Sequence, residues 1–229
     1  KAISFTMLHH ILLAAAALFG VFTILVIYRL IRPTVLSYPW PKDEDEYVGD
    51  KGKKVILAGS YNPPHYGHLA MLAYLAERYG EAIAVIGVNA TKKYDVTPEQ
   101  RAELIRKMVS AEKIQGKIRV EVVSGYIWRF AMKEKASILY RGIRSWGKDG
   151  AEERLLYILN SYGPILLGPL RWPIPTCYLE GKPEYLYISS TLVRGLCQKA
   201  KEEGKEPELS SIVPESVHVD ISKVYSKDK

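Results

Sequence analysis

The chain opens with an apolar segment that contains no charged side chain. From residue 2 to residue 28 there is no Lys, Arg, Asp or Glu. This run is longer than the ~20 residues that a helix needs to cross a bilayer core. It is also longer than the apolar region of a cleaved signal sequence, and its basic residues, Arg29 and Arg32, follow it. The pattern predicts a single transmembrane helix over residues 1–32 that meets lipid over residues 3–28.

The basic residues after this segment set its expected orientation. By the positive-inside tendency, the C-terminal part of the chain lies on the cytosolic side, or on the matrix side of an organelle membrane. We therefore expect a single-pass membrane protein, with the mitochondrial inner membrane as a candidate location. Residues 33–54 follow with three prolines and the charged run 42–46. Prolines break a continuing helix and charged runs are typically solvated, so this stretch is predicted to be a linker.

From residue 55 onward, short apolar runs alternate with segments of helical periodicity. Thr97 to Gln100 has the composition of a capping box, with a proline at the first helical position. Alternation of this kind predicts an α/β domain over residues 55–229, built on a doubly wound parallel sheet with right-handed crossovers. The predicted strands are 55–58, 83–88, 119–123, 137–140 and 176–179, and the predicted helices are 69–79, 98 onward, 126–135, 151–160 and 190–203.

The first predicted strand leads into the sequence GSYNPPHYGH, residues 59–68. A buried strand, a tight Gly/Pro turn and a helix form the layout of a phosphate site at the mouth of a parallel sheet. His65 and His68 fall where the helix begins, and the helix dipole favours an anion there. Gly59 and Gly67 allow the backbone to approach a ligand closely.

Polar residues also follow the other predicted strands. They converge on one edge of the sheet, where ligands of such sheets bind. Basic groups, hydroxyls and imidazoles without a carboxylate pair suit polyphosphate binding and the stabilisation of charge on phosphorus. The set comprises Ser60, Asn62, Lys92, Lys93, Arg141, Arg144, Ser189, Ser190, Thr191 and Arg194.

Composition narrows the alternatives. The net charge is +7, but the residues after position 32 carry 29 basic and 25 acidic side chains, so we expect no nucleic-acid partner. Cys177 and Cys197 lie too far apart for a zinc motif, and no metal site of the protein itself is expected. Neither GxGxxG nor GxxxxGK[ST] occurs, so neither a dinucleotide fingerprint nor a P-loop explains the predicted phosphate site.

The sequence from about residue 53 resembles the nucleotidyltransferase superfamily that carries (H/T)xGH and ISSTxxR motifs. It is most similar to bacterial-type phosphopantetheine adenylyltransferases. GSYNPPHYGH resembles that family's GTFDPxTxGH, LYRGIR resembles its strand followed by RGLR, and YISSTLVR resembles its FISSSLVK/R. The resemblance implies a Rossmann-like nucleotidyltransferase fold, while the membrane segment and the linker lie outside it.

The family performs an in-line transfer of the adenylyl group of ATP, used with Mg²⁺, to 4′-phosphopantetheine. This implies that His68 acts on the α-phosphate, and that Ser60, Lys92 and Arg141 act on the acceptor phosphate and the transferred group. The implied nucleotide contacts come from Gly59, Ser60, His65, His68, Arg144, Glu153, Ser189, Ser190, Thr191 and Arg194.

Three departures keep other functions open. His65 stands where phosphopantetheine enzymes usually have Thr, and Asn62 replaces the usual Asp. GSxNP is also similar to the motif of nicotinamide or nicotinate mononucleotide adenylyltransferases. The apolar, Pro/Gly-rich stretch 162–175 differs from the family and indicates a docking surface. A membrane-tethered phosphopantetheine adenylyltransferase, a mononucleotide adenylyltransferase, and an accessory subunit of a respiratory or photosynthetic membrane complex with optional activity are therefore all consistent with the sequence.

Overall fold

The computed structural model describes residues 5–40, 52–88, 94–171 and 174–226. The chain divides into two compact units, residues 1–34 and 35–229. The first unit contains α1 (Phe5–Ile31), a helix of 27 residues. Among the described helices it is the one that is long and apolar enough to cross a membrane, over Phe5–Arg29. The predicted apolar helix is therefore present.

The second unit is built on a six-stranded parallel sheet with the order β1-β6-β5-β2-β3-β4. The chain order reverses between the central neighbours β2 and β5, where Ala58 pairs with Arg141. In sheets of this kind the reversal point is where ligands bind. The predicted fold class is confirmed. The strands are β1 (Thr34–Leu36), β2 (Lys54–Gly59), β3 (Glu81–Val88), β4 (Lys117–Ser124), β5 (Ile138–Ile143) and β6 (Thr176–Glu180).

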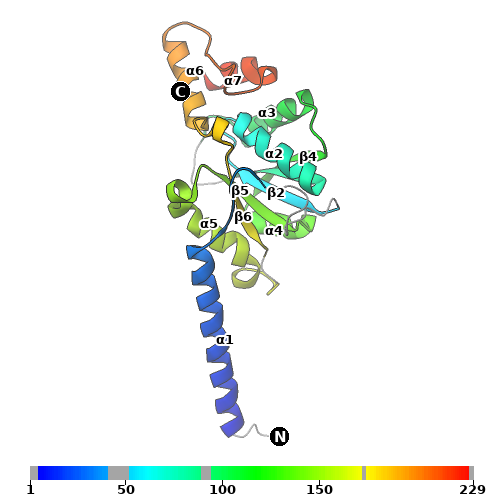
Figure 1. Cartoon of the computed structure of the whole chain (residues 1–229), viewed down its shortest axis with the longest axis vertical. Helices are drawn as coiled ribbons and strands as arrows, with labels where there is room; N and C mark the ends of the chain where they lie inside the picture. The colour runs from blue at the N-terminus through cyan, green and yellow to red at the C-terminus, as the bar shows by residue number, and fades with distance from the viewer. Residues whose placement is uncertain (1–4, 41–51, 89–93, 172–173, 227–229) are drawn as a thin grey trace. The chain divides into compact units, whose positions relative to one another are not determined.

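Helices cover both faces of the sheet (Figure 1). Side chains of β2 alternate between the faces: Val55 and Leu57 pack with α2 and α3, whereas Ile56 and Ala58 pack with α4. Both faces are apolar, as expected for a parallel sheet that is buried on both sides. The helices are α2 (Tyr66–Tyr79), α3 (Pro98–Ala111), α4 (Ile127–Glu134), α5 (Trp146–Leu166), α6 (Ser190–Glu202) and α7 (His218–Tyr225), with the short 3₁₀ helices η1 (Pro183–Tyr185) and η2 (Glu215–Val217).

The predicted capping box is present at the start of α3. The Thr97 hydroxyl accepts from the Gln100 backbone N–H at 3.2 Å, and the Thr97 N–H donates to the Gln100 side chain at 3.0 Å. Two of the backbone groups left unpaired at the helix end are thereby satisfied.

Residues 34–40 differ from the linker prediction. Leu36 of β1 and Trp40 are buried, and the Trp40 indole donates to the backbone oxygen of Glu180 at 2.8 Å. Its ring also lies 4.8 Å from that of Tyr74 on α2. The folded unit therefore begins near residue 35 rather than 55, because β1 covers the edge of β6 that would otherwise expose unpaired backbone groups.

Two C-terminal segments are more ordered than the sequence indicated. Helix α5 continues to Leu166 with Pro164 inside it, and the first part of stretch 162–175 is therefore helical. The sequence predicted no helix after residue 203, yet His218–Tyr225 forms α7. Ile221 of α7 is buried against α3 and α6, and this burial explains why the lysine-rich segment is helical.

Candidate functional site

An arginine of α3 bonds to the backbone of the loop after β2. Tyr61 adopts a left-handed conformation with φ of 47°, and its buried hydroxyl donates to the backbone oxygen of Leu57 at 2.7 Å. Arg101 is buried and donates to the backbone oxygen of Ser60 at 2.5 Å. These two bonds fix the loop where the chain turns from strand to helix. The sequence analysis missed Arg101; its one sequence signal is a charged residue on the apolar side of an amphipathic helix.

The C-terminal helices α6 and α7 also bond to this loop. The Arg194 guanidinium of α6 donates to the backbone oxygen of Asn62, and the Ser190 hydroxyl donates to that of Pro63 at 2.7 Å. Tyr225 of α7 donates to the side-chain oxygen of Asn62 at 2.8 Å. Arg194 also donates to the Thr191 hydroxyl at 3.0 Å. The ISSTLVR segment therefore shapes the GSYNPPHYGH loop directly.

His65 and His68 form a close pair of tilted rings at the start of α2, with ring centroids 3.8 Å apart and an interplanar angle of 37°. Each Nδ1 is buried and has no hydrogen-bond partner among the described residues. Burial lowers the pKa of His65 from 6.5 to about 4. Burial, and secondly the neighbouring His65, lower the pKa of His68 well below its usual value. Both imidazoles are therefore neutral near pH 7, and His68 can donate an N–H to an oxygen without carrying charge.

Two adjoining pockets meet at His68, Met71 and Gly142. The larger has a volume of about 260 Å³ and the smaller about 150 Å³. A Cβ on Gly142 would lie 2.7 Å from the Met71 sulfur, so a larger residue here would require the Met71 side chain to move. The pockets lie at the carboxyl ends of the central strands, where the sheet order reverses.

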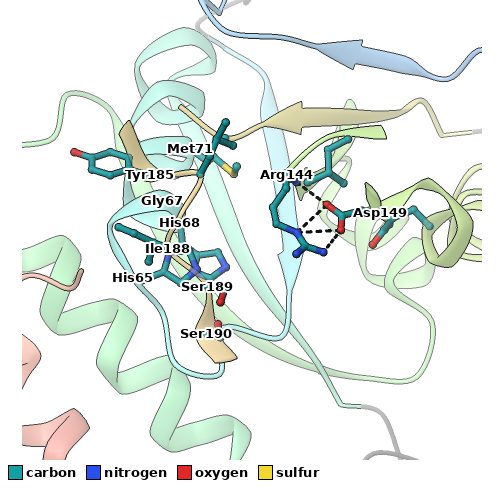
Figure 2. Close-up of a pocket in the computed structure, with 15 residues that line it drawn as sticks. His65, Gly67, His68, Met71, Arg144, Asp149, Tyr185, Ile188, Ser189 and Ser190 are labelled. Carbon is teal, nitrogen blue, oxygen red and sulfur yellow. Dashed lines mark hydrogen bonds and ion pairs between the residues drawn. The ribbon is translucent and has the colours of Figure 1, made fainter. Parts of the chain in front are cut away.

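The larger pocket combines a helix N-terminus with an arginine and an apolar wall (Figure 2). Ser189 caps α6 by accepting from the Leu192 N–H at 3.1 Å, and Ser189 and Ser190 both line the pocket. Arg144 reaches Asp149, whose carboxylate also accepts the Arg144 backbone N–H at 2.7 Å. Burial alone would raise the pKa of Asp149, but the hydrogen bonds and the charge of Arg144 together outweigh it and hold the pKa below its usual value. The apolar wall is formed by Met71, Ile143, Tyr185, Leu186 and Ile188.

The smaller pocket is bounded by the loop after β2 and by Arg141. Arg141 donates to both carboxylate oxygens of Glu153, at 2.6 and 2.9 Å, and to the backbone oxygen of Ala58 at 3.2 Å. Burial alone would lower the pKa of Arg141, but the paired carboxylate outweighs it and the pKa is raised. Arg141 is thus a fixed cation beside a pocket that Gly59 and Ser60 also line.

The structure brings most of the predicted site residues together. His65, His68, Arg144, Glu153, Ser189 and Ser190 line the larger pocket, and Gly59, Ser60, His68 and Arg141 line the smaller one. Thr191 and Arg194 are not among the lining residues described, and contact each other and the loop instead. Lys92 lies outside the described residues. Sequence reasoning missed Met71, Asp149 and Tyr225. Each of them contacts a site residue of another segment: Met71 lies beside Gly142, Asp149 pairs with Arg144, and Tyr225 bonds Asn62.

Comparison with known proteins gives a consistent result. The sequence model described as cytidylyltransferase-like matches residues 56–202. The phosphopantetheine adenylyltransferase of Chromobacterium violaceum is 31% identical over 176 residues, which cover 76% of this chain and 99% of that protein. The enzyme of the same name from Borreliella burgdorferi is 28% identical, covering 71% of this chain and 91% of its own.

A solved structure supports the fold. The nicotinic acid mononucleotide adenylyltransferase of Plasmodium falciparum, complexed with NaAD, aligns with a TM-score of 0.51 and 15% identity. The alignment covers 77% of this chain and 98% of that one. At this identity the likeness concerns the fold alone.

Proposed function

The chain belongs to the cytidylyltransferase-like family of nucleotidyltransferases, and on that premise we propose that it transfers the adenylyl group of ATP to 4′-phosphopantetheine. The products are dephospho-coenzyme A and pyrophosphate. The observation that carries the proposal is the meeting of two pockets at His68. An in-line transfer needs the donor nucleotide and the acceptor phosphate on opposite sides of one phosphorus atom, and a group that contacts that phosphorus group from the junction.

In this arrangement the larger pocket takes the nucleotide. The N–H groups at the start of α6, with Ser189 and Ser190, face its β- and γ-phosphates, and Arg144 supplies positive charge. Magnesium enters with ATP as part of the substrate. Arg141 and Ser60 face the acceptor phosphate in the smaller pocket, and Lys92 is proposed to join them.

The reaction then needs positioning and charge stabilisation rather than a general base. An oxygen of the acceptor phosphate forms a bond to the α-phosphorus, and the bond from that phosphorus to the bridging oxygen of pyrophosphate breaks. The bridging oxygen keeps the electron pair, and no proton moves because the acceptor phosphate is already ionised. Neutral His68 donates its N–H to an α-phosphate oxygen as charge develops there.

We further propose that α1 spans a membrane, with residues 35–229 on the cytosolic or matrix side. The length and composition of α1 support the span, and Arg29 and Arg32 support the orientation. The mitochondrial inner membrane stays a prediction, as does association with other subunits of a membrane complex.

Asn62 is the residue of the loop that bears on the choice of acceptor. The side-chain oxygen of Asn62 accepts from Tyr225 and anchors the loop, a role that the oxygen of the usual Asp could fill as well. It therefore does not favour a nicotinamide or nicotinate mononucleotide over phosphopantetheine. A recruited accessory subunit that keeps the fold and has lost turnover is the remaining alternative.

The test is pyrophosphate release by the purified chain with Mg-ATP and one of three acceptors: phosphopantetheine, nicotinamide mononucleotide or nicotinate mononucleotide. We expect release with phosphopantetheine alone. Release with a mononucleotide alone would replace the proposed acceptor. No release with any acceptor, together with a rise in melting temperature on adding ATP, would indicate a subunit that binds nucleotide without turnover.

A further inference from the structure

The end of the sheet opposite the pockets carries a cluster of exposed leucines. Helix α5 leaves the carboxyl end of β5 and returns to the amino end of the sheet, where the chain enters β6 at Thr176. Leu166, Leu167 and Leu170 lie on this return and are 56%, 48% and 82% exposed. We call these three residues the leucine edge. Their exposure is not a consequence of a loose fold, because Tyr162 and Ile174 on either side are buried.

Basic side chains accompany the leucine edge. Arg171 follows Leu170 and is exposed. Helix α4 packs on α5 and ends at the same end of the sheet, where Lys133 and Lys135 are exposed. The neighbouring acid, Glu134, is already paired with Arg119 and lies 3.5 Å from Lys54. Leucines flanked by Lys and Arg are the composition of surfaces that enter the headgroup region of a bilayer with anionic lipids.

The connection to α1 reaches the same end of the sheet. Only Arg32 and Pro33 separate α1 from β1, and two residues span roughly 7 Å at most. β1 runs parallel to β6, and Trp40 beyond its carboxyl end bonds Glu180 at the carboxyl end of β6. The start of β1 therefore lies at the end of the sheet where the leucine edge precedes β6. A span in α1 would keep this end close to the membrane surface.

We propose that the leucine edge, with Arg171, Lys133 and Lys135, is seated on the bilayer that α1 crosses. The inference rests on the membrane span proposed above. Because the pockets lie at the carboxyl ends of the strands, the same seating makes them open away from the lipid, toward water-soluble substrates. We prefer the bilayer to a protein partner for two reasons. The short covalent connection to α1 would bring lipid close to this end of the sheet, and the flanking Arg171, Lys133 and Lys135 can bind lipid phosphates.

The experiment uses the full chain in vesicles of phosphatidylcholine and phosphatidylglycerol. Single variants Leu167→Cys and Leu170→Cys carry an environment-sensitive nitrobenzoxadiazole label; the native Cys177 and Cys197 are buried. Tyr187→Cys, 58% exposed beside the pocket residues Leu186 and Ile188, is the matched control. We expect quenchers attached to lipid to quench the labels at 167 and 170 severalfold more than the label at 187, and iodide in the water to do the reverse.

Carbonate extraction of the same vesicles separates the two proposals. If the chain resists extraction but the three labels are quenched equally by lipid, the seating is wrong and the span stands. Protection of labels 167 and 170 from iodide without lipid quenching would assign the leucine edge to a second copy or another protein, and would overturn the seating. Release of the chain by carbonate would overturn the span and the seating together.

Discussion

His68 is the residue on which the proposed chemistry depends most, because both pockets reach it. We expect His68→Ala to lower kcat/KM by at least about 100-fold, the usual cost of removing one donor to a developing phosphate charge. The side chain is only partly buried, so the melting temperature should change little. His68→Gln, which keeps an N–H donor, should retain more activity than the alanine variant. Wild-type turnover in His68→Ala would remove His68 from the mechanism.

The histidine pair also predicts a dependence of stability on pH. The folded-state pKa of His65 is about 4, against 6.5 when unfolded, so between these pH values the unfolded chain binds protons that the folded chain does not. The free energy of unfolding should therefore be highest above pH 6.5 and fall toward pH 4, by roughly 3 kcal/mol for His65. His68 shifts in the same direction and adds to the effect.

Urea unfolding followed by tryptophan fluorescence between pH 7.5 and 4.5 (roughly the window set by the two pKa values) measures this slope. In His65→Asn it should be clearly shallower, whereas His10→Asn, in α1 outside the folded unit, should leave it unchanged. An identical slope in wild type and His65→Asn would show that His65 is not held in its neutral form by the fold.

The pairing of Arg141 with Glu153 allows stability and activity to be separated. Removing one member of a buried ion pair leaves an unpaired charge, so we expect Glu153→Ala to lower the free energy of unfolding by about 3 kcal/mol. The double variant Arg141→Met, Glu153→Leu should recover most of that loss, because apolar replacement of a buried pair is often neutral. It should still lack acceptor turnover, since the proposed phosphate contact is gone. Turnover in the stable double variant would exclude Arg141 from the site.

At this scale, sequence reasoning reached the residue types and missed their partners. Strand ends followed by polar residues were enough to place His65, His68, Arg141 and Arg144 at one edge. The pairing of Arg141 with Glu153, and of Tyr225 with Asn62, depends on how separate elements pack. The sequence around each of these residues carries no signal of its partner.

At the scale of elements, strong local patterns were sufficient and weak ones were not. The capping box fixed the start of α3, and continuous apolar runs located β2 and β3. The predicted helix 151–160 stops short of Gly163 and Pro164, two residue types that disfavour a helix interior. Packing overrides that preference: Gly163 lies against the Trp128 ring of α4, where a Cβ would come within 2.4 Å of the indole nitrogen.

β1 is the strand that no pattern indicated, and Trp40 anchors the residues that follow it through its bond to Glu180. Trp40→Ala should lower the free energy of unfolding by about 3–5 kcal/mol, the range for a buried Trp in a core. Tyr38→Ala, at a partly exposed ring 5.7 Å from Trp40, is the matched control and should cost less. Activity at low temperature should persist, because neither ring lines a pocket among the described residues. Equal unfolding midpoints for wild type and Trp40→Ala in chemical denaturant would mean that Trp40 does not stabilise the fold.

For the whole molecule, the family match and the folded unit start at different places. The match begins at residue 56, whereas the compact unit begins at residue 35. The intervening segment contributes β1 and Trp40, which cover the edge of β6. The chain between α1 and the nucleotidyltransferase domain is thus partly a component of the domain itself.

Two shortened chains test this directly. A chain of residues 35–229 should fold, keep its turnover per molecule with soluble substrates, and match the urea midpoint of the full chain's domain. A chain of residues 53–229 retains every described pocket residue but loses Leu36 and Trp40, so its free energy of unfolding should fall by at least about 3 kcal/mol. Equal free energies of unfolding for the two chains would mean that β1 and Trp40 do not stabilise the domain. A large difference would mean that the residues that follow α1 also complete the sheet, so that a domain cut at the start of the family match would lack one of its strands.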